Sequence, residues 1–207
     1  MNTTINRLTI GNNVLSIPAG AFKYSSLHGS VIIPDSVREI GAGAFKGCGD
    51  IDSIYLGCNI ESGAGNAFGG CSGIRSIRYN ARNCRNAMFY GVSLNQLQTI
   101  TIEDSVRNIP PYCFSDMKFR NSLYLDVDSI GDNAFANCDS LTSITINTQD
   151  IGSSTFADCD NLTSIIINVK DIGQSTFADC NKLSQVTLGD SVQIIGDSAF
   201  ANCDSLT

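Results

Sequence analysis

Apolar residues recur along this chain in a fixed phrase. Residues 129–147 read SIGDNAFANCDSLTSITIN, and close copies follow at 150–168 and 171–189. Each copy has an Ile, a Phe five residues later, a Cys three residues after that, and a Leu that opens a tail of alternating apolar and polar residues. This repetition indicates a solenoid, because a unit of 20 to 29 residues cannot bury its own apolar face and must stack on its neighbours.

The phenylalanine of the phrase can be followed through the whole chain. Spacings of 21, 23 or 25 residues separate its nine copies, which are Phe22, Phe45, Phe68, Phe89, Phe114, Phe135, Phe156, Phe177 and Phe200. Gly63 and Cys84 replace the usual Ile in two coils, and the spacing of 25 after Phe89 makes the fourth coil irregular. We expect one solenoid domain over residues 1–207, with about nine coils, truncated within the last coil.

The tails of the phrases predict short strands, because they alternate apolar and polar residues and are rich in Ile and Thr. Residues 5–10 are similarly predicted to form a strand. The segment 133–141 is too short for more than one helical turn, which favours a 3₁₀ turn or an extended arc. The predicted fold class is therefore an α/β-type solenoid with a parallel β-sheet on one face and short turns, 3₁₀ turns or extended arcs on the other.

The stretches IPDSVREIGAGAFKGC (33–48) and SIGDNAFANCDSLTSITI (129–146) resemble the BspA-like, or Treponema-type, leucine-rich repeats. The resemblance covers all nine phenylalanines. It implies a right-handed leucine-rich-repeat superhelix, an extracellular or cell-surface location, and adhesion to host proteins or other cells. The chain departs from the pattern at Gly63 and Cys84, and where Ser25, Val92 and Met117 replace the cysteine. Local distortion is expected in those coils.

Charge argues against nucleic acid as a partner. The sequence has a net charge of −7 and a pI near 4.5, whereas phosphate contacts need clustered Lys and Arg. Residues 1–120 carry 11 basic and 8 acidic side chains, and residues 121–207 carry 2 and 12. No apolar run is long enough to span a membrane, and the first residues do not resemble a signal peptide.

Cysteine is the most regular chemically reactive residue of the repeat. Six of the nine cysteines stand three residues after a phenylalanine: Cys48, Cys71, Cys138, Cys159, Cys180 and Cys203. One cysteine per coil suits neither a tetrahedral zinc site nor good disulfide geometry. We expect a column of buried, reduced thiols, with Cys84 in the irregular coil more exposed than these.

Catalytic chemistry has few candidate residues. The single histidine, His28, has no evident nucleophile to serve, and the paired carboxylates recur at turn positions rather than facing each other across a cleft. Calcium binding at the acidic turn around Asp158 and Asp160 is left open. We therefore expect no enzyme, no catalytic or metal-binding residue and no cofactor.

Binding is better supported than catalysis, because a solenoid presents a long ordered sheet face. Most outward strand positions hold Ser or Thr. Larger side chains are predicted at Ile32, Tyr55, Arg78 and Tyr124, and Tyr and Arg are enriched at binding hot spots. Four arginines close in sequence form a second group near the irregular coil, beside two side chains that are predicted to be exposed, and an acidic or anionic partner could dock there: Arg75, Arg78, Arg82 and Arg85, with Met88 and Tyr90.

Two functions from different classes follow. The first is a non-enzymatic recognition or adhesion module that binds a protein or glycan on a host or neighbouring cell through the sheet face and the fourth coil. The second is a structural spacer that holds another domain. The last coil leaves an apolar face uncovered, and three explanations stay open: a longer native protein, missing later residues, or end-to-end self-association.

Overall fold

A computed structural model describes residues 8–90, 92 and 94–207. The chain divides into two compact units, residues 1–106 and 107–207. In the described residues of both units every strand pairing is parallel, and no residue is in a helix. The observed fold is thus a parallel β-solenoid, and the helical and 3₁₀ parts of the predicted fold class are not found. The expected single domain over residues 1–207 stays a prediction.

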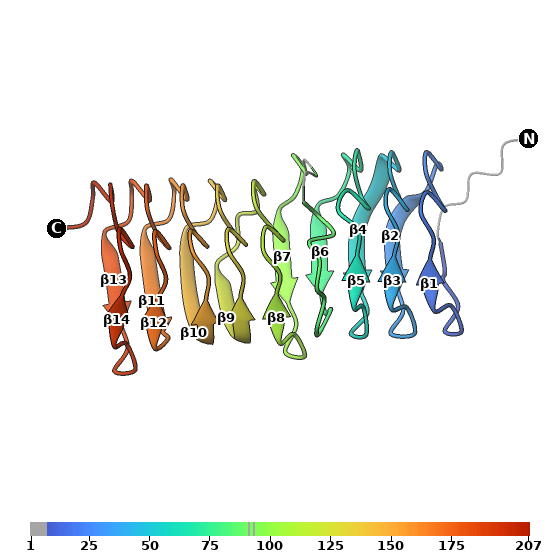
Figure 1. Cartoon of the computed structure of the whole chain (residues 1–207). Coiled ribbons are helices and arrows are strands. Elements are labelled where there is room, and N and C mark those ends of the chain that lie inside the picture. Colours follow the sequence, from blue (N-terminus) through green and yellow to red (C-terminus); the bar gives the residue numbers. More distant parts are fainter. Residues whose placement is uncertain (1–7, 91, 93) are drawn as a thin grey trace, which may run out of the picture. The chain divides into compact units, whose positions relative to one another are not determined.

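The first unit contains two parallel sheets, to which most coils contribute one strand each (Figure 1). The larger sheet has the order β2-β4-β6-β7 and the smaller one β1-β3-β5. The strands are β1 (Ser16–Ile17), β2 (His28–Ile33), β3 (Glu39–Ile40), β4 (Asp50–Leu56), β5 (Ser62–Gly63), β6 (Ser76–Tyr79) and β7 (Thr99–Ile102). Residues 5–7 of the strand expected at 5–10 lie outside the described residues, and Thr9 makes an isolated parallel bridge with Ile32.

The second unit repeats this arrangement with sheets β13-β11-β10-β9-β8 and β12-β14. Its strands are β8 (Asn108–Ile109), β9 (Leu123–Ile130), β10 (Ser143–Ile151), β11 (Ser164–Asn168), β12 (Asp171–Ile172), β13 (Gln185–Leu188) and β14 (Ile194–Ile195). β9 and β10 have 8 and 9 residues. Each of them runs on through the corner at which most other coils have two separate strands.

Stacked phenylalanines form the centre of each unit. Ring centroids of successive coils lie 5.1–5.3 Å apart from Phe22 to Phe89 in the first unit and 5.2–5.5 Å apart from Phe114 to Phe200 in the second. The inward Ile and Leu residues of the strands, such as Ile144 and Ile146, complete the core. The predicted phenylalanine column and inward strand positions are confirmed.

Left-handed residues two positions before and two positions after the phenylalanine prevent most of the arcs that carry it from forming a helix. Around Phe135, Asn133 has φ 54° and Asn137 has φ 59°. This alternation turns the N–H groups of all three residues toward the next coil, where they donate to the carbonyls of Ser153, Thr155 and Ala157 at 2.8–3.0 Å. In a helix, these groups would bond within their own coil. Gly, Asn and Asp occupy many of the left-handed positions because these residues tolerate them best, and Ser occupies three of them.

Candidate binding surface

A row of outward side chains crosses the larger sheet of the first unit. Ile32 of β2 is in register with Tyr55 of β4, and Tyr55 with Arg78 of β6. Residues opposite each other on adjacent strands lie about 4.8 Å apart and point to the same face. Ile32 is 41% exposed, Tyr55 is half-buried, and the Arg78 side chain is 60% exposed. These three residues, called the Tyr55 row below, form one continuous surface.

Arg78 is held in place from two directions. The centre of its guanidinium lies 5.1 Å from the ring centroid of Tyr55, and its Nε donates a hydrogen bond of 2.8 Å to Oε1 of Glu103. The same bond and the charge of Glu103 raise the pKa of Arg78. Asn80 Nδ2 in turn donates to the hydroxyl of Tyr55 at 3.3 Å. A charged side chain that is ordered in advance loses less conformational freedom on binding.

Glu103 and Asn80 were not among the residues predicted from the sequence. Each stands two residues beyond an outward position, Glu103 after Thr101 and Asn80 after Arg78. Because side chains two residues apart point to the same side of a strand, the alternation itself could have identified them. Ser105 donates a hydrogen bond to Oδ1 of Asn80, which extends the polar network beyond the ends of the strands.

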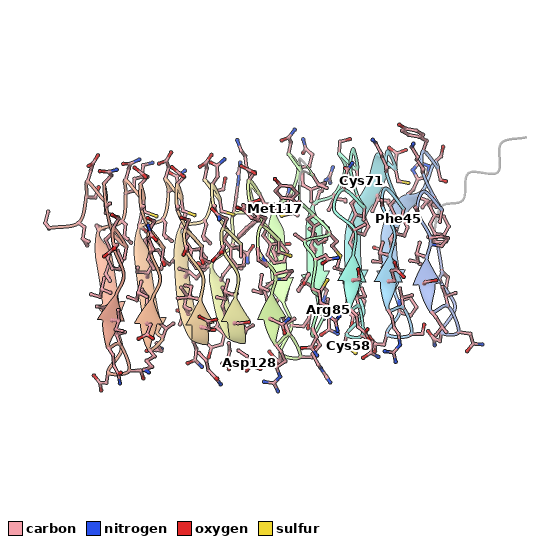
Figure 2. All side chains as sticks on the ribbon, in the orientation of Figure 1. Phe45, Cys58, Cys71, Arg85, Met117 and Asp128 are labelled. Carbon is pink, nitrogen blue, oxygen red and sulfur yellow. The ribbon has the colours of Figure 1, made fainter. Side chains whose placement is uncertain are left out.

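The four arginines that are close in sequence do not gather at one place. Arg75 precedes β6 and Arg78 lies within it, whereas Arg82 and Arg85 follow the strand, beyond the sheet face. Backbone bonds from Arg82 to Cys58 and from Arg85 to Glu61 tie this second pair to the turn of the preceding coil, and Figure 2 shows Arg85 and Cys58 at the same end of their coils. All four are exposed, but only Arg78 belongs to the Tyr55 row.

The prediction that Met88 is exposed is wrong. Met88 is fully buried, whereas Tyr90 is 55% exposed as expected. Met88 stands where most coils have Ala, and its side chain fills the space left by Gly63, as a Cβ atom on Gly63 would lie 2.5 Å from Cβ of Met88. The small size of Gly63 thus leaves room for the larger Met88 side chain in the neighbouring coil.

Tyr124, the remaining predicted binding residue, lies on the sheet of the second unit. It is 63% exposed and in register with Thr145, which is followed across the sheet by Ile166. Ile166 is 44% exposed and was not singled out from the sequence. Beside this row the hydroxyls of Ser122 and Ser143 lie 2.6 Å apart, so small hydrogen-bonded side chains cover much of this face.

The cysteine column is buried, as predicted, and its thiols have a structural role. Each thiol donates to the carbonyl oxygen of the phenylalanine one coil earlier, at 3.0–3.3 Å. Desolvation is the main cause that raises the pKa of Cys71 to about 12 and that of Cys203 to about 11. The thiols of Cys71 and Cys203 therefore stay protonated and poorly nucleophilic.

The expectation that Cys84 is more exposed is wrong. Cys84 is 1% exposed, its thiol donates to the carbonyl of Asn86 at 3.1 Å, and burial raises its pKa. The loop insertion after Phe89 does not open this part of the coil, because Val92, Leu94 and Leu97 all turn inward. Among the described residues, Cys58 is the only cysteine that is not buried.

The described residues contain little that could act as a catalytic or metal centre. Nδ1 of His28 lies 3.4 Å from a carboxylate oxygen of Asp50 at the start of two adjacent strands. No group of three or more His, Cys, Asp or Glu side chains in this part of the chain is arranged to hold a metal ion. In the same residues there is no helix long and apolar enough to cross a membrane.

Comparison with solved structures identifies repeat proteins of the same fold. A leucine-rich repeat protein from Bacteroides ovatus is 27% identical and superimposes with a TM-score of 0.78 over 98% of this chain. Leucine-rich repeat proteins from T. pallidum and Eubacterium ventriosum share the fold at 22% and 20% identity, with TM-scores of 0.57 and 0.56 over 86% and 100% of this chain. The chain spans 53%, 78% and 60% of these three proteins, respectively.

Sequence comparison gives a family but no individual relative. A search of curated proteins finds no significant match. The family model described as "BspA type Leucine rich repeat region (6 copies)" matches residues 1–120 and 85–207, and so covers the whole sequence. This match, which agrees with the stacked parallel coils, shows that the chain belongs to the BspA-type leucine-rich repeat family.

Proposed function

We propose that this chain is a non-enzymatic recognition module that binds a protein or glycan partner through the Tyr55 row. The observation that carries the proposal is the ordered contact of Arg78 with Tyr55 and Glu103 on an exposed sheet face. Tyr and Arg are the residues that most often dominate binding energy. Their neighbours Ser30, Ser53 and Thr99 are small, so the row stands out from its surroundings.

The proposal includes an adhesive role at a cell surface or outside the cell. It is supported by the sequence resemblance to the adhesive members of the family. Arg82 and Arg85 give the partner a second, salt-sensitive contact at the end of the coils, because exposed charges attract an anionic surface mainly at low ionic strength.

A binding screen with matched variants tests this function. The purified chain is offered to extracellular-matrix proteins, glycan arrays and whole cells, beside the Tyr55→Ala, Arg78→Ala double variant and a Tyr124→Ala variant as control. We expect the double variant to lose at least about tenfold in affinity for the partner, and Tyr124→Ala to bind as the parent does. Equal binding by the parent and the double variant would contradict the proposal.

The alternative, a structural spacer, draws support from the sheet face of the second unit. Its Ser122–Ser143 hydroxyl pair and the neighbouring threonines form a polar surface with few large side chains that could dominate binding. A spacer predicts that the screen finds no partner for the parent chain. Any partner whose binding depends on the Tyr55 row decides in favour of recognition.

A further inference from the structure

The free edge of the Arg78 guanidinium is the most specific chemical feature of the Tyr55 row. The guanidinium carbon lies over the ring of Tyr55, and Nε donates a hydrogen bond to Glu103. Among the described residues, no hydrogen bond engages Nη1 or Nη2 of Arg78. A guanidinium fixed in this way presents two parallel N–H groups to solvent, which is the geometry that binds a carboxylate in a bidentate manner.

The charge around Arg78 favours an anion with a single charge. Glu103 places one carboxylate against Nε at 2.8 Å, so the local charge of the pair is close to zero. A phosphate, with nearly two negative charges, would be repelled by Glu103 more strongly than a carboxylate would. The exposed ends of Arg78 therefore suit a carboxylate better than a phosphate.

The remaining residues of the row favour a protein segment over a sugar. A sugar usually stacks on a bare aromatic face, but one face of Tyr55 is covered by the Arg78 guanidinium. The other large exposed member of the row is Ile32, an aliphatic side chain that suits an apolar side chain of a partner. Since Ile32 and Arg78 are two strands apart, about 10 Å separates them.

We propose that the Tyr55 row binds a protein segment that presents a carboxylate to the outer edge of Arg78 and, about 10 Å away, an apolar side chain to Ile32. This inference rests on the proposed function and names the partner chemistry of the same site. The ring of Tyr55 packs against the guanidinium, and the hydrogen bond to Glu103 fixes its orientation. The partner is thus recognised by one acidic and one apolar residue at a set distance.

Peptide selection on the intact chain tests this chemistry. Short random peptides displayed on phage are selected on the immobilised chain, and binders that prefer it to the Tyr55→Ala, Arg78→Gln double variant are kept. We expect Asp or Glu to be enriched, together with an apolar residue at a constant spacing. The best peptide is then made with its acidic residue and with the matching Asn or Gln, and both are titrated by fluorescence anisotropy.

A double-mutant cycle locates the contact. Neutralising the peptide's acidic residue and the Arg78→Gln change should each weaken binding by about ten- to a hundredfold, and the two together should cost little more than either alone. Arg78→Lys, which keeps the charge but not the planar fork, should also weaken binding. Arg75→Gln removes the same charge from an exposed site near the same strand and should change affinity by less than about threefold.

The outcomes separate this inference from the proposed function. Peptides without acidic enrichment, or peptides that bind Arg78→Gln as tightly as the parent while still needing Tyr55 and Ile32, would overturn the carboxylate contact and leave the row as a binding surface. If no peptide prefers the parent chain to the double variant, the inference fails, whereas the proposed function is decided by the screen of matrix proteins, glycans and cells. Unchanged thermal unfolding of each variant excludes misfolding as the cause.

Discussion

At Gly63, a Cβ atom would lie 2.5 Å from Cβ and 2.8 Å from Cε of Met88. Most coils have Ile at the position of Gly63 and a small residue, often Ala, at the position of Met88. Here the larger Met88 side chain fills the space that the missing Ile side chain would occupy in the neighbouring coil. Tyr79 and Cys84 form a similar pair: fully buried Tyr79 stands in an Ile or Leu column, and Cys84, whose thiol it contacts, replaces an Ile. Residues that break the repeat here compensate each other.

The Gly63 and Met88 pair gives a test of this compensation. Gly63→Ile alone should destabilise the chain by about 1–3 kcal/mol through overpacking, and Met88→Ala alone by about 2–5 kcal/mol through a cavity. Combined, they restore the usual pair and should recover at least about 1 kcal/mol relative to the sum. Urea unfolding measures all three, and Gly11→Ala, which meets open space, is the control. Strict additivity would refute the compensation.

Thiol reactivity should distinguish Cys58 from the other cysteines. With Ellman's reagent at about pH 8, one thiol should react quickly in the native chain, and Cys58→Ser should remove that phase. Burial and the neighbouring Asp35 raise the pKa of Cys58, so the rate should increase with pH, and Asp35→Asn should accelerate it. Cys84→Ser is the matched control and should leave the fast phase intact. A fast phase that disappears with Cys84→Ser would contradict the buried position of this thiol.

Among the structural elements, the phenylalanine column stabilises each unit because its rings stack from one coil to the next. Phe156 is fully buried and stacks on both Phe135 and Phe177, whereas half-buried Phe200 stacks on Phe177 alone within the described residues. Thiols and arc N–H groups bond between the same coils. The stability of each coil therefore depends on the presence of a neighbouring coil on both sides.

Phe156→Leu should accordingly cost more than Phe200→Leu. The first change loses two aromatic contacts and some buried volume, for about 1–3 kcal/mol, and the second loses one contact at a partly exposed site, for about 1 kcal/mol or less. Chemical unfolding followed by circular dichroism measures both. Equal losses would show that stacking between coils contributes little.

For the molecule as a whole, charge is divided unequally. Residues 1–106 carry 8 basic and 7 acidic side chains, and residues 107–207 carry 5 and 13. In the second unit, desolvation and neighbouring carboxylates raise the pKa values of Asp139 and Asp158, with Asp160 and Asp179 among the neighbours. A raised pKa in the folded state means that folding is favoured when these groups are protonated.

The stability of the second unit should therefore respond to pH in a defined direction. The contribution of Asp139 and Asp158 is fully present below the ordinary Asp pKa of about 3.9 and is lost as the pH rises through their raised values. At about pH 7 and low salt, Asp158→Asn should increase Tm by roughly 1–2 °C, and the gain should vanish near pH 3. Asn fits the left-handed backbone there, as Asn137 and Asn202 do. Asp190→Asn, with the same charge change in the β13–β14 turn, is the control.

Much of the fold could be predicted from individual residues, and less of the surface. Phe135 and Cys138 repeat at a constant spacing, so their inward position followed from the need of each coil to stack on the next. The choice between a 3₁₀ turn and an extended arc stayed open because the left-handed residues, such as Ser154 and Ser175, are not confined to Gly or Asn. Met88 and Cys84 were wrongly predicted to be exposed. Where the repeat is interrupted, the sequence pattern does not show whether a side chain points into the core or toward solvent.

The sequence by itself determined the repeat period, the buried columns and the outward positions of Ile32, Tyr55 and Arg78. When similar coils stack, equivalent positions of the repeat share the same environment, either buried or exposed. Only the tertiary structure decided which irregular residues compensate each other and which side chains meet. Glu103 and Tyr55 are 48 residues apart, and both contact Arg78 because successive coils bring their strands side by side. Such contacts depend on register between coils, which residue type and spacing alone do not specify.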